Sequence, residues 1–282
     1  MSMQTVNTVV QLRAAVKVWR LAGESIAFVP TMGNLHQGHL KLVEAAKNNA
    51  DRVVVSIFVN PTQFGVTEDF GSYPRTEAAD QEKLAAANAD LVFLPTVADV
   101  YALGARTTVV VDGLSNAYCG LSRPGHFVGV ATIVCKLFNM VQPDVALFGA
   151  KDFQQLMVIR TMVMDLNIPV DIIGVETVRE ESGLAMSSRN GYLSDSERVI
   201  AAKLYQVLCR ARTSILAGNQ SLKEIEVDSV FFLHKAGFHP EYFNICRSSD
   251  LKKADQDDRE LVILAAAKLG KTRLIDNIQL SR

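Results

Sequence analysis

The chain carries almost no net charge, because 29 lysine and arginine residues face 30 aspartate and glutamate residues and leave −1 at pH 7. Proteins that bind a nucleic acid backbone usually show a clear excess of basic residues. This sequence has no such excess, so we do not expect DNA or RNA as a partner. A local cationic pocket for a small anion is still compatible with the overall balance.

Cysteine is scarce as well: only four occur among 282 residues, and none forms a CxxC pair. Widely spaced cysteines are typical of reduced thiols in a cytosolic protein rather than of a disulfide framework. The apolar runs are short, far below the ~20 residues that span a bilayer, and the first twenty residues lack the apolar core of a signal peptide. We therefore expect a cytoplasmic protein without a membrane segment.

What the sequence does contain is a regular alternation of apolar runs and helical patterns in its first 176 residues. The expected strands are 26–30, 52–60, 91–95, 145–149 and 170–177, and the expected helices are 38–50, 76–89, 127–141 and 152–166. Apolar strands separated by helices are typical of a parallel sheet covered on both faces. We predict an α/β, Rossmann-like domain over residues 1–176, with ligands beyond the carboxyl ends of its strands.

The last third of the chain has a different pattern. Two helical segments, 194–216 and 221–236, precede strand-like runs at 242–247, 261–267 and 272–279. Helices followed by consecutive strands are typical of an α+β domain. We predict a smaller α+β domain with an antiparallel sheet over residues 177–282, which begins with a polar loop at 178–190.

The first candidate site is Pro-Thr-Met-Gly-Asn-Leu-His-Gln-Gly-His at 30–39, between the first expected strand and its helix. Gly33 and Gly38 permit close approach of a ligand to the backbone, and the positive end of the helix favours a phosphate. His36 and His39 can both donate hydrogen bonds to charge that builds on phosphorus. A tight turn with two surface histidines is the alternative, but the position after a buried strand favours a nucleotide site. Zinc is less favoured because a third ligand is lacking.

Amide side chains mark the end of the second expected strand. Pro61 stops that strand, and Asn60 and Gln63 stand on either side of it. Amides donate and accept hydrogen bonds, which suits a hydroxy acid as ligand. A simple strand-ending turn explains the same residues and, considered alone, is the better interpretation.

A third candidate, Gly149-Ala150-Lys151-Asp152-Phe153-Gln154-Gln155, follows the expected strand at 145–149. Lys151 can hold a phosphate oxygen as a point charge. Asp152 can cap the following helix or bind a ribose hydroxyl, and Gln155 lies one turn into that helix. A capped helix start with a solvated lysine would explain Asp152 but not Gln155.

The fourth candidate is Met186-Ser187-Ser188-Arg189-Asn190, in the loop that joins the two halves. Two hydroxyl groups and a guanidinium in sequence suit a triphosphate. A flexible linker is the alternative, but methionine and arginine within the serine run favour a functional role. Three strand-end segments and one loop therefore converge on a single predicted site.

Taken together, these segments resemble the pantothenate synthetase family of pantoate–β-alanine ligases. The chain contains PTMGNLHQGH, FVNPTQF, YPRT, RPGHFVGV, KDFQQL and GLAMSSRNGYLS in the order of that family. HxGH alone is shared with class I aminoacyl-tRNA synthetases and several nucleotidyltransferases. The resemblance implies a homodimer that condenses pantoate with β-alanine, using ATP and Mg²⁺, by way of a pantoyl adenylate and with release of pyrophosphate and AMP.

The resemblance also implies roles for individual residues. His36 and His39 would stabilise the α-phosphate, with His39 as the acid. Gln63 and Gln155 would hold pantoate, and Asn60 would lie beside them near the β-alanine site. The implied ATP-binding residues are Met32, Gly33, Asn34, Leu35, His36, Gln37, Gly38, His39, Gly149, Ala150, Lys151, Asp152, Val178, Met186, Ser187, Ser188 and Arg189. Lys151 would act on the phosphates and complete the catalytic set.

Two positions stand apart from this pattern. Asp80 is the candidate ligand of Mg²⁺, although its place in the first turn of an expected helix explains a carboxylate there equally well. Family members often carry glutamate where this chain has Ala150, which matters little if the backbone makes the contact with ATP.

Two other functions share part of the pattern. A nucleotidyltransferase would have the same histidine turn and phosphate loop, but it would join a nucleotide to a phosphate. The glutamines after the second and fourth expected strands favour a carboxylate substrate instead. A non-catalytic nucleotide-binding module would not need two separate cationic clamps.

Replacing Lys151 or Arg189 by alanine is expected to impair formation of the acyl adenylate, because each residue is a cation in a segment predicted to face phosphate. Single-turnover measurement of adenylate from ATP and pantoate, with each folded variant, checks this. A normal rate in either variant would refute the role of that residue.

Overall fold

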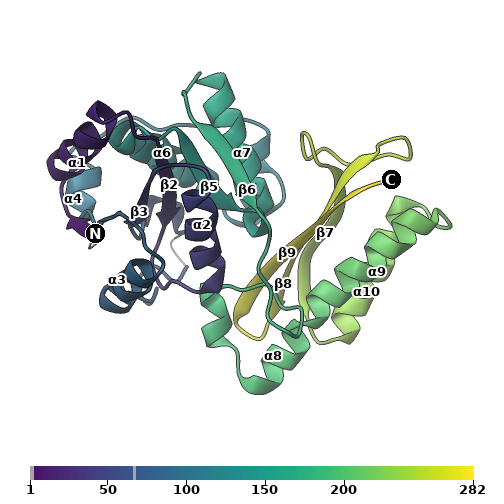
Figure 1. Ribbon diagram of the computed structural model, residues 1–282. Helices are drawn as coiled ribbons and strands as arrows, with labels where there is room; N and C mark the ends of the chain where they lie inside the picture. The colour runs from purple at the N-terminus through teal and green to yellow at the C-terminus, as the bar shows by residue number, and fades with distance from the viewer. Residues whose placement is uncertain (1–2, 66–67) are drawn as a thin grey trace. The chain divides into compact units, whose positions relative to one another are not determined.

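The computed structural model describes residues 3–65 and 68–282. The chain forms two compact units (Figure 1). The first unit comprises Met1–Ala150 and Gln155–Glu176, and the second comprises Lys151–Gln154 and Thr177–Arg282. The four residues at 151–154 thus belong to the second unit although the chain on both sides of them belongs to the first.

The first unit is built on a fully parallel sheet, as predicted, although it has six strands rather than the five expected. Its strands are β1 (Gln4–Val6), β2 (Ile26–Thr31), β3 (Arg52–Ile57), β4 (Leu91–Phe93), β5 (Val145–Gly149) and β6 (Asp171–Val175). Their order across the sheet is β1-β4-β3-β2-β5-β6. The strand order reverses between β2 and β5, and such a switch point is where α/β sheets open a crevice for ligands.

Helices cover both faces of this sheet (Figure 1). They are α1 (Val9–Leu21), α2 (Gln37–Lys47), α3 (Glu77–Ala86), α4 (Val97–Val100), α5 (Cys119–Ser122), α6 (His126–Val141) and α7 (Phe153–Asp165), with short 3₁₀ turns η1 (Pro61–Gln63), η2 (Leu114–Asn116) and η3 (Ala150–Asp152). In β2, Val29 joins the core cluster that contains Val43 of α2. Its neighbour Phe28 points the other way and meets the ring of Phe138 in α6, with centroids 6.4 Å apart. The two-residue period of a strand therefore places β2 in contact with both helical layers.

β1 and α1 lie within the first 25 residues, where the sequence pattern predicts no element. A capping box begins α1: Thr8 accepts a hydrogen bond from the backbone of Gln11, and the Gln11 side chain accepts one from Thr8. Leu12 and Val16, one turn apart, are buried. Ser/Thr at N-cap and Gln at N3 is a readable start signal, whereas a three-residue strand is too short to show a period.

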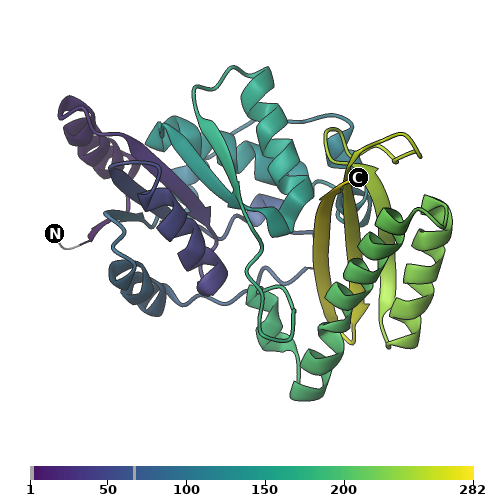
Figure 2. The ribbon, with the colours of Figure 1, turned by 45° about the vertical axis from the view of Figure 1, so that its right-hand side comes forward.

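The second unit has a three-stranded antiparallel sheet, as predicted, with the order β7-β8-β9 (Figure 2). Its elements are η4 (Ser188–Tyr192), α8 (Asp195–Ala201), α9 (Lys203–Ala217), α10 (Leu222–Lys235), β7 (His239–Arg247), β8 (Glu260–Leu269) and β9 (Thr272–Ser281). Leu208 of α9 and Leu233 of α10 share one core with Ile263 of β8, and all three are fully buried. The helices therefore stabilise the sheet from one face.

The single helix expected at 194–216 is wrong in one respect, because the structure divides it into α8 and α9 at Ala202. Ala202 keeps helical dihedral angles, φ −60° and ψ −25°. The Ala202 N–H donates to the Arg198 carbonyl, and the Ala202 carbonyl accepts from the Gln206 N–H. Both N···O distances are 3.4 Å, which is beyond the usual range for such a bond. An apolar pattern cannot reveal such a local loosening.

Two further features of the described chain concern membrane-spanning helices and cysteines. No helix within residues 3–65 and 68–282 combines the length and apolarity that a membrane crossing requires. The four cysteines are all free thiols, and Cys119 and Cys246 are buried.

Helix α6 packs against η1 at a point where only glycine fits. A Cβ atom at Gly129 would lie 2.4 Å from the carbonyl oxygen of Thr62 and 2.7 Å from the Cα atom of Gln63. Both neighbours are backbone atoms, so neither can rotate away. This close approach joins the first turns of α6 to the 3₁₀ turn that follows β3.

Replacing Gly129 by alanine is expected to lower the free energy of unfolding by about 1–3 kcal/mol, because an overpacked contact with backbone must be relieved by movement of η1. Urea unfolding of the variant measures this. Gly71→Ala is the matched control, because a Cβ atom there meets nothing within 4 Å. Equal stability of the two variants would contradict the prediction.

Candidate active site

The histidine turn (residues 32–39) begins where β2 ends. Gly33 and Asn34 both have left-handed backbones, with φ of +80° and 50°. A Cβ atom at Gly33 would also approach Ile57 Cγ2 to 3.0 Å and Asp80 Oδ2 to 3.2 Å. Glycine is therefore required at this position for two reasons, the dihedral angle and the space.

A buried carboxylate accepts hydrogen bonds from the backbone of this turn. Asp80 accepts hydrogen bonds from the backbone N–H groups of Asn34 and Leu35, both 2.8 Å long, and from the Thr76 hydroxyl at 3.0 Å. Its side chain is fully buried, and the Lys83 ammonium lies 3.9 Å away and donates to the Leu35 carbonyl at 2.7 Å. Asp80 thus anchors the turn.

Those contacts argue against Asp80 as a ligand of Mg²⁺. Both carboxylate oxygens already accept hydrogen bonds, and no part of the side chain reaches solvent. Within residues 3–65 and 68–282, no group of three or more His, Cys, Asp or Glu side chains could hold a metal ion. The other interpretation of Asp80, a residue of the first turn of a helix, accounts for its position in α3.

The two histidines start helix α2 as a capping pair. His36 is the N-cap and accepts a hydrogen bond from the Gly38 N–H on Nδ1 at 3.1 Å, while His39 Nδ1 accepts from the His36 N–H at 3.3 Å. The ring centroids lie 4.2 Å apart. Since Nδ1 accepts in each ring, the neutral imidazole carries its proton on Nε2. Both rings therefore have Nε2–H as the donor nitrogen, as the predicted role on a phosphate requires.

One detail of that prediction needs correction. The positive end of the helix near Gly38 is expected to favour a phosphate, which requires backbone N–H groups that are not already paired. The Gly38 N–H instead donates to the His36 ring, and the His39 N–H donates to the His36 carbonyl at 2.8 Å. The histidine side chains, rather than these backbone groups, are the donors that the turn can direct at an anion.

The amide turn (residues 60–63), which follows β3, is organised by Asn60. Its Oδ1 atom accepts from the Tyr101 hydroxyl at 2.8 Å and from Thr62 Oγ1 at 2.9 Å. Its Nδ2 atom donates to Gln63 Oε1 at 3.1 Å and to the Gly129 carbonyl at 3.2 Å. With 1% of its surface exposed, Asn60 has its polar atoms engaged inside the protein. It therefore holds the Gln63 amide in place, and its expected position near β-alanine stays a prediction.

The Gln63 amide links this turn to the histidine turn. Its Nε2 atom donates to the Met32 sulfur at 3.1 Å, and its Oε1 atom accepts from Asn60. A thioether is a weak acceptor, and Nε2 has a second proton, so the amide keeps hydrogen-bonding capacity for a ligand. The structure thus brings Met32, Asn60 and Gln63 together, as the sequence predicted.

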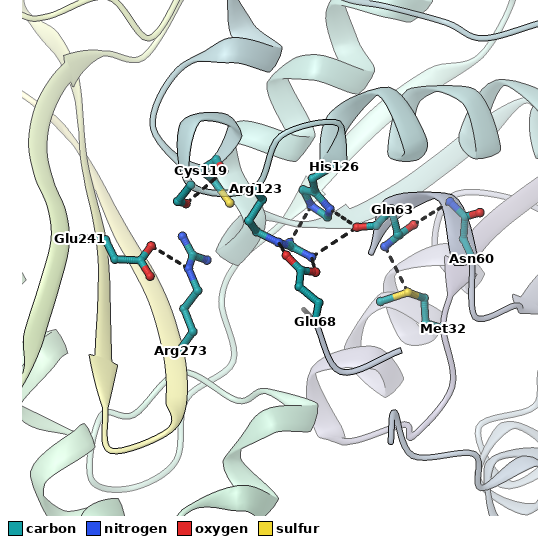
Figure 3. A network of polar contacts seen from close by, with 10 residues as sticks. Met32, Asn60, Gln63, Glu68, Cys119, Arg123, His126, Glu241 and Arg273 are labelled. Carbon is teal, nitrogen blue, oxygen red and sulfur yellow. Dashed lines mark hydrogen bonds and ion pairs between the residues drawn. The ribbon is translucent and has the colours of Figure 1, made fainter. Parts of the chain in front are cut away.

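A chain of polar contacts continues from Gln63 to an ion pair (Figure 3). His126 Nδ1 lies 2.8 Å from the Gln63 carbonyl oxygen, and Arg123 Nη1 lies 2.9 Å from His126 Nε2. Arg123 also holds Glu68 with two hydrogen bonds, of 2.7 and 2.6 Å. The segment RPGHFVGV contributes to the family resemblance, but the sequence predicts no role for Arg123 or His126.

In the second unit, Lys151 and Asp152 lie side by side, with Lys151 Nζ 3.9 Å from Asp152 Oδ2. The Lys151 side chain is 17% exposed. Its carbonyl accepts a hydrogen bond from Asn277 of β9 at 2.8 Å. This bond fixes the backbone that carries the lysine to the sheet of the second unit.

The predicted loop at 178–190 is more ordered than its composition indicates. Arg179 and Ala185 form an antiparallel bridge, and the Met186 N–H donates to the Val178 carbonyl at 2.9 Å. Arg179 forms two hydrogen bonds with the buried Asp276, of 2.7 and 2.9 Å. The loop is therefore a small hairpin that brings Val178 beside Met186.

The serine–arginine segment follows this hairpin directly. Ser187 is the N-cap of η4 and accepts a hydrogen bond from the Arg189 N–H at 3.2 Å. Asn190 is buried and donates to the Ala185 carbonyl at 3.1 Å and to Glu180 at 3.0 Å. These contacts give the segment at 186–189 a defined backbone rather than that of a flexible linker.

The remaining predicted residues of the first unit lie at or after the end of β5. Gly149 ends β5 beside Val175, and Ala150 is buried at 8% exposure. Gln155 of α7 is half-buried, and among the described residues its amide has no hydrogen-bond partner. The chain thus carries one set of candidates in the first unit and a second set, Lys151, Asp152, Val178 and Met186–Arg189, in the second unit.

Burial and charge act in opposite directions on Glu68. Burial alone raises the pKa of its carboxyl group, but the hydrogen bonds and positive charge of Arg123 outweigh it and hold the pKa below the usual 4.5. The ionised form of Glu68 is thereby favoured in the folded protein, and the pair with Arg123 is intact at neutral pH.

Comparison with known proteins gives one consistent family. The family model described as Pantoate-beta-alanine ligase matches residues 4–279. A pantothenate synthetase of Shewanella loihica is 56% identical over 282 residues, which cover 99% of this chain and 100% of that protein. A pantothenate synthetase of Alteromonas mediterranea is 54% identical, with the same coverage.

Two solved structures agree with this result. The pantothenate synthetase of Thermus thermophilus has a TM-score of 0.94 and 44% identity, and the match covers 99% of this chain and 100% of that one. The pantoate-β-alanine ligase of Francisella tularensis, complexed with β-γ ATP and β-alanine, has a TM-score of 0.82 and 34% identity over 98% and 97% of the two chains.

Replacing Glu68 by glutamine is expected to flatten the acid dependence of stability. A carboxyl group whose pKa is lowered on folding stabilises the protein above its unfolded pKa, and this contribution is lost as the pH falls through the folded pKa. The difference in unfolding free energy between the wild type and Glu68→Gln should therefore shrink from about pH 6 to about pH 3. Urea titrations at both pH values measure it, and a difference that does not change with pH would contradict the prediction.

Proposed function

The chain belongs to the pantoate–β-alanine ligase family, and from this premise we propose that it condenses pantoate with β-alanine through a pantoyl adenylate, with ATP converted to AMP and pyrophosphate. The observation that carries the proposal is the direct contact of the amide turn with the histidine turn, where Gln63 donates to the sulfur of Met32. A group suited to an organic acid thereby adjoins a pair of donors suited to a phosphate.

In the first half-reaction, a carboxylate oxygen of pantoate attacks the α-phosphorus of ATP. The bond from that phosphorus to the oxygen bridging to the β-phosphate breaks, and pyrophosphate leaves with the bonding electrons. Charge on the phosphate oxygens is the main obstacle, and positioned donors lower it. His36 and His39 supply such donors through Nε2–H, and the capping bonds to Nδ1 hold both rings in that tautomer.

In the second half-reaction, the amine of β-alanine attacks the acyl carbon of the adenylate, and AMP leaves. Both steps transfer a group between bound molecules, so positioning supplies much of the rate and no covalent enzyme nucleophile is needed. Ser187 and Ser188 are therefore phosphate ligands in this proposal rather than nucleophiles.

Gln63 and Gln155 are the proposed ligands of pantoate. The Gln63 amide is oriented by Asn60 and Met32, and the Gln155 amide has no partner among the described residues. Asn60 acts behind Gln63, because its own polar atoms are engaged. The resemblance placed Asn60 beside the two glutamines, near the β-alanine site; in this proposal it acts through Gln63.

ATP is the proposed ligand of the remaining candidates. Lys151 and Arg189 supply positive charge for its phosphates, and the backbone of Val178 is the proposed contact for adenine. The hairpin hydrogen bond between Val178 and Met186 keeps the adenine and phosphate segments next to one another in the second unit.

Mg²⁺ is proposed to bind together with ATP. The described residues provide no group of three metal ligands, and Asp80 is fully buried and already accepts three hydrogen bonds. Mg²⁺ usually keeps several waters and binds through substrate phosphates with few protein carboxylates. We therefore treat it as part of the Mg²⁺–ATP complex. The family resemblance further leads us to propose a homodimer that works in the cytoplasm.

The two half-reactions can be separated by pyrophosphate exchange. If pantoate is activated first, the protein should incorporate radiolabelled pyrophosphate into ATP when pantoate is present and β-alanine is absent. A ligase that phosphorylates its acid would release ADP and show no exchange, whereas a nucleotidyltransferase would not depend on pantoate. Exchange that is absent with pantoate, or unchanged without it, would overturn the proposed mechanism.

A further inference from the structure

The RPGH segment at 123–126 has no place in the chemistry described so far, yet its side chains contact the backbone of the amide turn. We propose that Glu68, Arg123 and His126 are positioning residues for the acid substrate: they orient Gln63 through its backbone carbonyl. This inference rests on the proposed function, in which Gln63 binds pantoate.

The direction of each hydrogen bond follows from the chemistry of arginine. A guanidinium is a donor only, so Arg123 Nη1 must donate to His126 Nε2, at 2.9 Å. His126 then carries its proton on Nδ1 and donates it to the Gln63 carbonyl at 2.8 Å. Arg123 Nη2 lies 3.4 Å from the same carbonyl oxygen. The arginine thus selects the histidine tautomer that can hold Gln63.

Glu68 in turn fixes Arg123. The two groups form a bidentate pair, with distances of 2.7 and 2.6 Å, and their side chains are 22% and 14% exposed. Such a planar, two-bond contact sets the orientation of a guanidinium as well as its position. Figure 3 shows the resulting row from Glu68 through Arg123 and His126 to Gln63.

Helix α6 supplies a rigid base for this row. His126 is its first residue, and three residues later Gly129 lets the helix approach the backbone of η1 and accepts a hydrogen bond from Asn60. Gln63 is thereby held at two ends: His126 fixes its carbonyl, and Asn60 fixes its amide. A change at His126 should move the amide relative to the acid while leaving the histidine turn, which α3 anchors through Asp80, in place.

Two polar substitutions of His126 separate positioning from general structure. Asparagine places an N–H near the position of Nδ1 and keeps the donor to Gln63, whereas glutamine places it near Nε2 and loses that bond. We expect His126→Gln to raise the KM for pantoate roughly 5- to 150-fold, the range that a lost buried hydrogen bond supports. The KM for ATP should change less than about twofold, and His126→Asn should restore most of the loss.

Lysine at position 123 provides a second, independent variant. It cannot form two bonds to Glu68 and a third to His126, so Arg123→Lys should also raise the KM for pantoate. Arg52→Lys is the matched control, because Arg52 forms a similar pair with Glu24 at 2.8 Å, is 20% exposed, and begins β3 at the opposite end of the strand from η1. The control should keep the wild-type KM for every substrate.

Steady-state kinetics with each substrate varied in turn, on variants shown to be folded by circular dichroism, decides the question. A wild-type KM for pantoate in His126→Gln, or an equal rise of all KM values in His126→Gln and His126→Asn, would overturn the inference. If His126→Gln does not fold, Arg123→Lys against Arg52→Lys carries the test in the same way. A wild-type protein that makes no AMP from ATP, pantoate and β-alanine would instead refute the proposed function.

Discussion

The first unit depends on one buried carboxylate. Asp80 is fully buried, and it accepts two backbone N–H groups of the turn that precedes the histidines. A carboxylate that accepts backbone hydrogen bonds can be stable without solvent. Because Gly33 and Asn34 adopt left-handed conformations there, the turn needs this external hold to direct the chain into α2. The position of both histidine rings follows from that single contact.

The same arrangement recurs at the other functional segments. Glu68 holds Arg123, which supports the amide turn, and Asp276 holds Arg179, which closes the hairpin before the serine–arginine segment. Each carboxylate is thus paired within the protein and set behind the groups proposed to meet the ligands. Since ATP and pantoate are anions, a carboxylate facing them would repel them. At these three positions negative charge has a structural role, and the groups proposed to meet the phosphates and pantoate beside them are neutral or cationic donors.

Much of this could be predicted from the sequence. Apolar strands and their order of appearance predict the parallel sheet, and the strand ends mark the histidine turn, Gln63 and Lys151 as candidates whose roles stay predictions. Other features have no local signal: a carboxylate at position 80 suits a metal ligand or the first turn of a helix, and only its hydrogen bond with Asn34 reveals the anchor. The pair of Glu68 and Arg123 joins residues 55 positions apart, and no local pattern encodes such a contact.

The burial of Asn60 is a second feature that no local sequence pattern predicts. Only the family resemblance placed this residue near the β-alanine site, and the neighbours that engage its amide, Tyr101 and Gly129, come from segments with no sequence signal of contact. A buried amide with all its partners inside the protein cannot be told from an exposed one by sequence alone. Burial, rather than residue type, decides which strand-end groups reach a ligand.

The assignment of residues 151–154 to the second unit means that the backbone passes from one unit to the other three times, after positions 150, 154 and 176. Neither unit is therefore a continuous stretch of sequence. A gene fragment cut after residue 176 would carry Lys151 without Asn277, the residue that binds its carbonyl. The two units are consequently not interchangeable modules, and recombination that exchanged one of them between relatives would have to transfer both of its segments together.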